Sequence, residues 1–188
     1  MKAAILVFLC LTALAACKQD IVAIPDPVKM TPEALGHYCQ MNLSEHPGPK
    51  AQVHLKGVDA PIYFAQVRDA IAYQRMPEQS HAIAAIYVND MSAAPSWETP
   101  GDDNWLAVTS AHFVVGSDRT GGMGAPELVP FSEIAAAEDF AARHGGRIVR
   151  LEAIADADVL TPDQSAKDME DDQDFIDRLG RLEREENG

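Results

Sequence analysis

A repeated pattern of apolar residues is the feature that most constrains the fold of this chain. One set of apolar residues recurs later in the chain at the same helical spacing, so each set would form one apolar face of a helix. The two sets are Phe64, Val67, Ala70 and Tyr73, and Phe131, Ile134, Ala137 and Phe140. Four matched positions can arise by chance, but the segments around them match as well.

Strand-like segments surround each predicted helix in the same order. Residues 51–55 and 111–115 lie before the two helices, and residues 83–88 and 147–154 follow them. The shared order is strand, strand, helix, strand. A unit this small cannot bury a sheet face by itself. We therefore predict an α+β fold in which two small homologous ββαβ lobes pack together.

The N-terminus has the pattern of an exported lipoprotein. Residues 3–16 form an almost entirely apolar run after Lys2, and the run is shorter than the roughly 20 residues that span a bilayer. Residues 14–17 resemble a lipobox, in which the cysteine receives lipid. We expect cleavage before Cys17, lipid on Cys17 and a periplasmic location, with Lys18 favouring the outer membrane. The alternative is an ordinary signal peptide with a chance cysteine at the cut.

Four regions follow from this pattern. Residues 1–16 are the signal peptide, 17–30 a lipidated cysteine with a flexible tether, 31–160 the folded body, and 161–188 an acidic, mobile tail. The predicted lobes cover about residues 31–95 and 96–160. The chain has 29 acidic and 15 basic residues and a net charge of −14, which argues against nucleic acid as a partner. We expect membrane contact through the anchor only.

The cysteines leave one thiol without an internal partner. Cys10 leaves with the signal peptide and Cys17 carries the lipid, so Cys39 stands alone. In an exported protein, Cys39 would be an intermolecular disulfide partner, a reactive thiol, a metal ligand or a small buried hydrophobe.

Sulfur atoms near Cys39 favour the metal-ligand interpretation. Cys39 and Met41 lie two positions apart, so on an extended segment their side chains leave the same face. Met123 stands within the glycine-rich segment 121–124, where the backbone can approach a ligand closely; insertion of Met123 into an apolar pocket is an equal alternative. Cu(I) prefers polarizable sulfur donors. We predict a Cu(I) site of Cys39, Met41 and Met123, with His37 as a possible nitrogen donor.

Met91 is a further possible sulfur ligand. It follows the predicted strand 83–88 and precedes a polar loop that contains Trp97 and Trp105. A hydrophobic cap on the loop is the favoured explanation of Met91, and core anchoring is the favoured explanation of the two tryptophans. The remaining histidines show no ligand spacing: His46, His54, His81, His112 and His144.

At these residues the sequence resembles the NosL family of nitrous-oxide reductase accessory lipoproteins. The resemblance runs through residues 38–41, 48–52, 87–91, 116–117 with 121–124, 130–131 and 140–146. It implies two ββαβ lobes and Cys39, Met41 and Met123 as metal candidates. It also implies a periplasmic Cu(I) chaperone that is not an enzyme, for the copper-sulfide centre of nitrous oxide reductase. The implied partners are that enzyme, an ABC-type transporter and the transporter's periplasmic partner protein. Only the acidic tail is expected to be particular to this chain.

Two other functions remain open from the residues. A thiol enzyme would use Cys39 as nucleophile with His37 nearby, but a plausible third residue is missing. A metal-free scaffold would dock the transporter through the acidic tail and the tryptophan loop.

Overall fold

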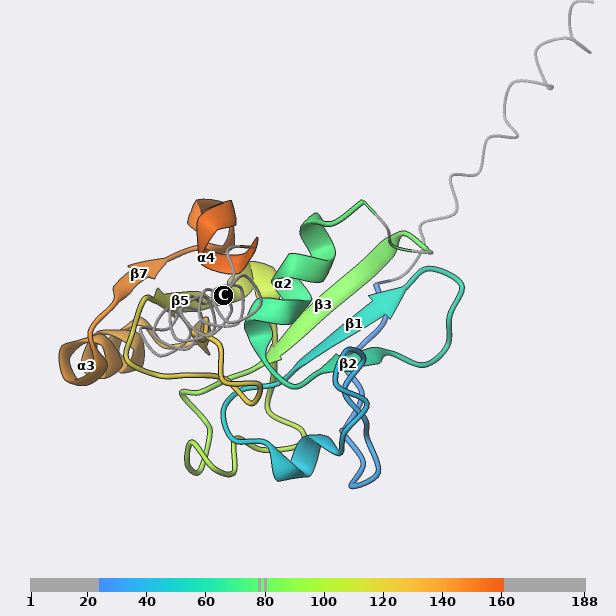
Figure 1. Ribbon diagram of the computed structural model, residues 1–188, viewed down its shortest axis with the longest axis horizontal. Coiled ribbons are helices and arrows are strands. Elements are labelled where there is room, and N and C mark those ends of the chain that lie inside the picture. Colours follow the sequence, from blue (N-terminus) through green and yellow to red (C-terminus); the bar gives the residue numbers. More distant parts are fainter. Residues whose placement is uncertain (1–23, 78, 80, 161–188) are drawn as a thin grey trace, which may run out of the picture.

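The computed structural model describes residues 24–160 apart from residues 78 and 80. Cys17 and the segment 161–188, on which several predictions rest, lie outside the described residues. The described part contains two antiparallel sheets and three α-helices (Figure 1). The main elements are β1 (Ala51–Leu55), β2 (Ile62–Phe64), α2 (Val67–Arg75), β3 (Ile83–Asn89), β4 (Trp105–Ala107), β5 (His112–Val115), β6 (Val129–Phe131), α3 (Ile134–His144), β7 (Arg147–Val149) and α4 (Asp156–Leu160).

The two sheets share one topology, which confirms the predicted ββαβ repeat. The first sheet has the order β2-β1-β3-β4 and the second has the order β6-β5-β7. In each sheet the first strand of the unit lies in the centre, and the strands on either side of the helix flank it antiparallel. Strand β4 has no counterpart in the second sheet. It pairs with β3, so the chain contributes to the first sheet up to Ala107, beyond the lobe boundary expected near residue 95.

The helices begin later than the apolar repeat suggested. Phe64 and Phe131 are the last residues of β2 and β6, and α2 and α3 begin at Val67 and Ile134. An extended residue stands immediately before each helix, namely Gln66 with φ −147° and Glu133 with φ −95°. The predicted apolar spacing was therefore correct, but the first residue of each set, Phe64 or Phe131, lies at the end of a strand and not in the helix.

The last predicted strand is also shorter than expected. Strand β7 ends at Val149, and Leu151–Ala153 form a 3-10 turn. The alternation of apolar and charged residues over 147–154 is compatible with both conformations. Strand β7 pairs with β5 at three positions: Phe113 with Val149, Val114 with Ile148, and Val115 with Arg147.

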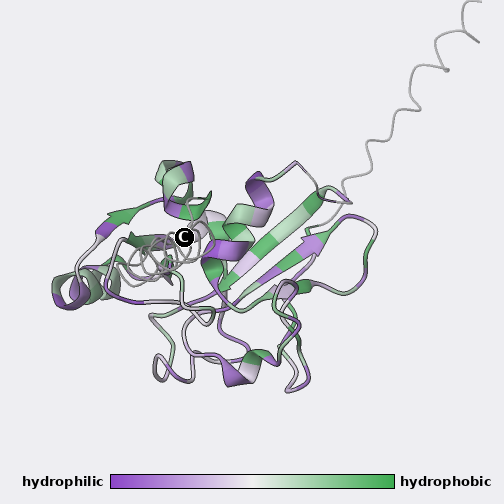
Figure 2. Cartoon of the chain, in the orientation of Figure 1, coloured by the Kyte–Doolittle hydropathy of each residue, from purple (hydrophilic) through white to green (hydrophobic). Residues whose placement is uncertain are grey.

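Strand β5 joins the two units, because its two faces enter different cores. Phe113 and Val115 pack in the main core with residues of α2 such as Val67 and Ile71. Val114 points the other way, into a second core that α3 covers. The lobes are thus packed together through α2. In Figure 2 hydrophobic residues run along most of β3, whereas α2 carries both kinds of residue.

Residues 24–30 are docked on the first sheet. Val28 N donates to Gln52 Oε1 at 2.9 Å, and Gln52 Nε2 donates to Val28 O at 2.9 Å. Tyr87 donates its hydroxyl to Pro25 O at 2.8 Å, and Met30 is buried. The prediction of a flexible tether over 17–30 is therefore wrong for residues 24–30. Gln52 lies on the face of β1 opposite the main core, and this segment covers that face.

None of the described helices is both long and apolar enough to cross a bilayer.

Candidate metal site

Cys39 and Met41 lie on a tight turn and not on an extended segment. Met41 O accepts from Gly36 N at 3.0 Å, and Gly36 O accepts from Gln40 N at 2.9 Å. Gln40 adopts a φ of 55°, in the left-handed region that non-glycine residues seldom use. The argument that Cys39 and Met41 leave the same face of a strand is therefore wrong. The turn instead closes the backbone between Gly36 and Met41, with Cys39 inside it.

The side chain of Gln40 helps to hold this turn. Its Nε2 donates to His37 O at 2.7 Å and to Gly36 O at 3.3 Å. These bonds offset the left-handed conformation, which costs roughly 1–2 kcal/mol for a residue with a Cβ. The turn is attached to the first sheet, because His37 N donates to Tyr63 O at 2.6 Å.

Cys39 is a free, half-buried thiol. It packs against a small apolar cluster of Met30, Ala34, Leu43 and Ala65. Its Sγ lies so close to Gly36 that a Cβ on Gly36 would overlap it. Glycine is therefore required there by close approach.

Met123 lies on a glycine loop that is pressed against the first unit. His46 Nδ1 donates to Gly122 O at 2.8 Å, and Met123 N donates to Gln66 Oε1 at 3.2 Å. A Cβ on Gly122 would lie 2.7 Å from His46 Cβ and 2.8 Å from Ala65 O. The glycine allows close approach to protein atoms. The Met123 side chain remains 44% exposed and does not insert into an apolar pocket.

Ala65 connects the two sulfur-bearing segments. Its side chain belongs to the cluster that Cys39 packs against, and its carbonyl oxygen faces Gly122. The Cys39 turn and the Met123 loop thus meet at the same residue, between β2 and α2, although they come from different ends of the body. Met41 is 43% exposed. Met41 and Met123 are thus exposed, and Cys39 is half-buried.

Comparison with known proteins now assigns the family. A family model described as NosL matches residues 27–159. The chain belongs to the NosL family. The copper-binding lipoprotein NosL of Achromobacter cycloclastes is 54% identical over 95% of this chain and 93% of its own length. The copper-binding lipoprotein NosL of Stutzerimonas stutzeri is 35% identical over 74% of this chain and 72% of its own length.

A solved NosL structure supports the fold, and the alignment with the Achromobacter sequence corrects the interpretation of the C-terminal segment. The crystal structure of the copper chaperone NosL from Shewanella denitrificans has a TM-score of 0.65 and 32% identity, and covers 72% of this chain and 98% of its own. The Achromobacter alignment takes in 95% of this chain, so it extends into residues 161–188. The expectation that this segment is particular to this chain is therefore wrong.

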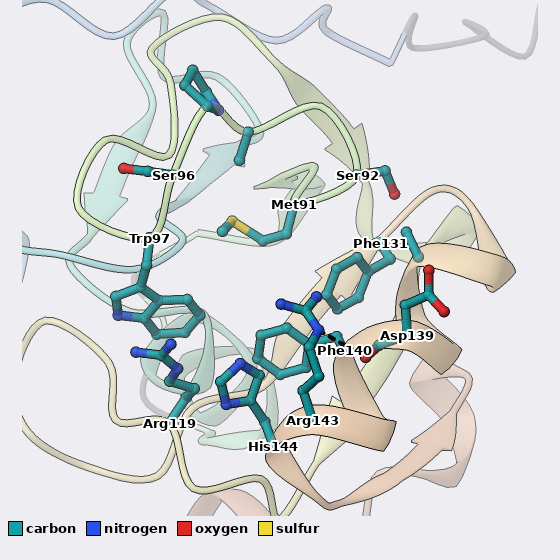
Figure 3. Close-up of a pocket in the computed structure, with 13 residues that line it drawn as sticks. Met91, Ser92, Ser96, Trp97, Arg119, Phe131, Asp139, Phe140, Arg143 and His144 are labelled. Atoms are coloured by element: carbon teal, nitrogen blue, oxygen red, sulfur yellow. Dashed lines mark hydrogen bonds between the residues drawn. The ribbon is translucent and has the colours of Figure 1, made fainter.

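The two additional ligand candidates, His37 and Met91, lie outside the apolar cluster against which Cys39 packs. The His37 ring packs against Phe64 and Tyr73, with ring centroids 5.5 Å and 5.6 Å away. Met91 packs in the second core with Phe131 and Phe140. Figure 3 shows Met91 above the cavity that these aromatic residues line. Packing accounts for both side chains, and their role as ligands of this NosL-family chain remains a prediction.

Two buried ionisable side chains, Lys50 and Glu127, lie next to the segments that form the candidate site. Lys50 Nζ donates to the carbonyls of His46, Pro47 and Gly48 at 2.8, 3.0 and 2.6 Å. Burial lowers the pKa of Lys50 to about 8, while the charges of Glu127 and Cys39 act in the opposite direction. The Lys50 ammonium thus holds the segment that carries His46.

Glu127 ties the glycine loop to the first helix. Its carboxylate accepts from Val67 N at 3.3 Å and Arg68 N at 3.1 Å, at the N-terminus of α2, where a negative charge is favoured. Complete burial raises the pKa of Glu127 to about 8, although these hydrogen bonds and one from Leu128 N favour the charged form. The loop and α2 therefore hold each other in place.

Sequence reasoning missed the residues that position the site. His46 was set aside because its spacing suggested no ligand. Lys50 lies in the matched segment 48–52, to which no chemistry was assigned, and Gln66 and Glu127 lie in no motif. The contacts are His46 with Gly122, Gln66 with Met123, and Glu127 with Val67. Each joins segments that are far apart in the chain. Within residues 24–160, apart from the two left out, no three His, Cys, Asp or Glu side chains gather in a way that could hold a metal ion.

Proposed function

We propose that this chain binds one Cu(I) ion through Cys39, Met41 and Met123 and transfers it to an acceptor as a copper chaperone. The observation that carries the proposal is the meeting of the Cys39 turn and the Met123 loop at Ala65. The names of the relatives support it, since two are called copper-binding lipoproteins and one a copper chaperone.

The donor set suits a soft monovalent ion. A thiolate and two thioethers match the preference of Cu(I) for polarizable sulfur, whereas zinc favours four nitrogen, thiolate or carboxylate ligands. Both methionines are about half exposed, at 43% and 44%. An incoming sulfur or imidazole of the acceptor can therefore enter the coordination sphere before Cys39 leaves it. The chemistry is ligand exchange, and the protein acts as a carrier rather than as an enzyme.

The acceptor that we propose is the maturation system of nitrous oxide reductase. The family resemblance supports delivery for the copper-sulfide centre of that enzyme, beside an ABC-type transporter and its periplasmic partner. The acidic chain, with a net charge of −14, would favour a basic docking face on the acceptor, which affects rate more than affinity.

We also propose that lipid on Cys17 anchors the mature protein in the periplasm, at the outer membrane. The word lipoprotein in the names of both curated relatives supports an anchor. Because residues 24–30 are docked on the first sheet, only residues 18–23 separate the anchor from the body. Six residues span at most about 20 Å. The body would then stay close to the membrane, and the acceptor would meet it there.

Copper titration tests the site directly. The mature chain from Lys18 onward is loaded anaerobically with Cu(I) against a chromophoric competitor, and Cys39→Ser, Met41→Leu and Met123→Leu are compared with the parent. We expect Cys39→Ser to weaken binding on the order of 100-fold and each methionine variant on the order of 10-fold, because each removes a soft donor.

The matched control is Ile134→Leu. Ile134 is 44% exposed and begins α3, outside the proposed site, so its replacement should leave the Cu(I) affinity unchanged. A parallel Zn(II) titration tests the softness of the site. If all three site variants bind one equivalent of Cu(I) as tightly as the parent, the site is wrong, and a metal-free docking scaffold becomes the better explanation.

A further inference from the structure

A cavity of about 390 Å³ lies on the second unit, away from the Cys39 turn. Its walls come from the loop of residues 91–97, from Arg119 and from α3 (Figure 3). The floor is aromatic. Trp97 stacks on Phe140 with centroids 6.2 Å apart and an interplanar angle of 21°, and Phe131 lies 5.3 Å from Phe140.

The cavity carries more positive than negative charge, with Arg119 and Arg143 against Asp139, although the chain as a whole is acidic. Arg119 places its guanidinium 5.2 Å from the centre of the Trp97 ring, and its buried Nε has no hydrogen-bond partner among the described residues. Arg143 Nε donates to Asp139 O at 3.1 Å, a bond within α3. Figure 3 shows both arginine side chains directed toward the aromatic residues.

Two guanidinium groups beside an aromatic floor fit one class of ligand. Guanidinium binds carboxylate with two parallel hydrogen bonds, and its planar face stacks on aromatic rings. The floor offers apolar surface for a neighbouring side chain. The ligand that fits is a peptide segment in which an aromatic or aliphatic residue is flanked by carboxylates.

The chain carries such a segment beyond the described residues. Asp174, Phe175, Ile176 and Asp177 lie within residues 161–188, a stretch rich in Asp and Glu. We propose that this cavity binds the chain's own C-terminal segment, with Phe175 on the Trp97–Phe140 floor and the adjacent carboxylates on Arg119 and Arg143.

The C-terminal segment is long enough to reach the cavity. The described chain ends with α4 at Leu160, and about 14 residues separate Leu160 from Asp174, which span up to roughly 45 Å. A folded body of this size is roughly 35–40 Å across. The ion pair between Arg147 and Asp158 holds α4 next to the residues that follow α3, so the cavity beside α3 lies within this reach.

Docking at this cavity would act on the loop that bears Met123. Arg119 and Met123 belong to the same connection between β5 and β6. Trp97 also lines the cavity, and its carbonyl oxygen accepts from Gly48 N at 2.7 Å. The carbonyl of Gly48 in turn accepts from Lys50 Nζ. An occupied cavity therefore restrains two segments of the proposed copper site, but the docking does not depend on copper.

Hydrogen exchange tests the proposal in the mature chain. The chain from Lys18 to Gly188 is compared with one that ends at Leu160; the solved Shewanella protein corresponds almost wholly to the body, so the shorter chain should fold. We expect residues 91–97, the loop around Arg119 and α3 to exchange several-fold more slowly in the longer chain. Equal exchange in these segments would overturn the proposal.

Addition of the segment as a separate peptide identifies the contacts. A peptide of residues 161–188 is titrated into the shorter chain, and binding is followed by the NMR signal of the Trp97 indole. Arg143→Ala in the body and Phe175→Ala in the peptide should each weaken binding by about 10-fold or more. The controls are Lys56→Ala, which removes a positive charge from the β1–β2 turn, and Leu182→Ala, which removes an apolar side chain elsewhere in the peptide.

The remaining outcomes are also decisive. If Lys56→Ala weakens binding as much as Arg143→Ala, general charge attraction explains the contact and the cavity is not the site. An unrelated acidic peptide of the same length that binds equally well would exclude the Phe175 contact and leave the cavity open to an acidic segment of another protein.

Discussion

The two ββαβ units share one topology, yet their helices have different environments. Helix α2 lies between the first sheet and β5, and five of its residues are buried. Helix α3 covers only the outer face of the second sheet and buries Ala137 and Phe140. A repeated topology therefore does not imply repeated roles. The first unit supplies the central helix, and the second supplies the loop with Met123 and the two arginines of the cavity.

The units also hold each other through carboxylates in unlike settings. Glu127, from the second unit, accepts from the N-terminus of α2, and complete burial raises its pKa to about 8. Asp90, from the first unit, accepts from Ser132 N at 2.9 Å and from Ser132 Oγ at 2.6 Å, just before α3. Burial opposes the charge of Asp90, but the hydrogen bonds from Ser132 and Ser92 prevail and lower its pKa. Only the Glu127 contact should depend on pH near neutrality.

The largest expected effect is the dependence of the free energy of unfolding on pH, which Glu127 causes. Its pKa is about 8 in the folded state against 4.5 as its ordinary value, so the folded state binds the extra proton. The stabilisation is greatest below pH 4.5 and is lost as the pH rises toward 8. The loss should be on the order of a few kcal/mol, and Glu127→Gln should abolish it.

Urea unfolding between pH 5 and pH 7.5 measures this difference. Lys50 adds little slope in that range, because its pKa is lowered from 10.5 only to about 8 and it titrates mainly above pH 7.5. Asp90→Asn is the comparison, since its lowered pKa places its titration below the range. Parallel curves for the parent and Glu127→Gln would show that Glu127 is ionised throughout.

The next largest effect separates the two equivalent loops. Gly122→Ala places a Cβ against His46 and Ala65, and overpacking of this kind should cost about 2–3 kcal/mol and weaken Cu(I) binding through displacement of Met123. Gly57, in the β1–β2 loop, has a φ of 77° and open space around it. Gly57→Ala should cost about 1 kcal/mol and leave Cu(I) affinity intact. Thermal unfolding and the copper titration report both quantities, and equal copper affinities for the two variants would count against the Met123 site.

The smallest effect compares two equivalent helix positions. Val67 in α2 is fully buried, whereas Ile134 at the same repeat position in α3 is 44% exposed. Val67→Ala should lower the free energy of unfolding by about 2 kcal/mol, and Ile134→Ala by less than about 1 kcal/mol. Chemical denaturation measures both. A larger loss for Ile134→Ala would mean that α3 is covered in solution, for example by the C-terminal segment.

Much of the fold was predictable from the chain because it depends on local periodicity. Strand 51–55 was predicted with the bounds that β1 has, and the order of strands and helices followed from the repeat. The prediction that residues 39–41 are extended was wrong, because they form a turn that the Gln40 side chain and Tyr63 in β2 hold. The flexible tether was wrong for residues 24–30, because Gln52 and Tyr87 hold them. Tyr63, Gln52 and Tyr87 are remote in sequence from the segments that they hold, and no local pattern identifies them.

The sequence by itself determined the apolar periodicity of the two units, Cys39 as the lone cysteine of residues 31–160, the methionines near it in sequence and in the glycine-rich segment, and the family motifs. These are properties of residue type and spacing, and they persist in any conformation of the chain. Only the tertiary structure decided that the Cys39 turn and the Met123 loop meet at Ala65, and that His46, Gln66 and Glu127 hold the loop there. Such contacts arise when distant segments pack, since backbone groups that lose water must find hydrogen-bond partners wherever the fold supplies them.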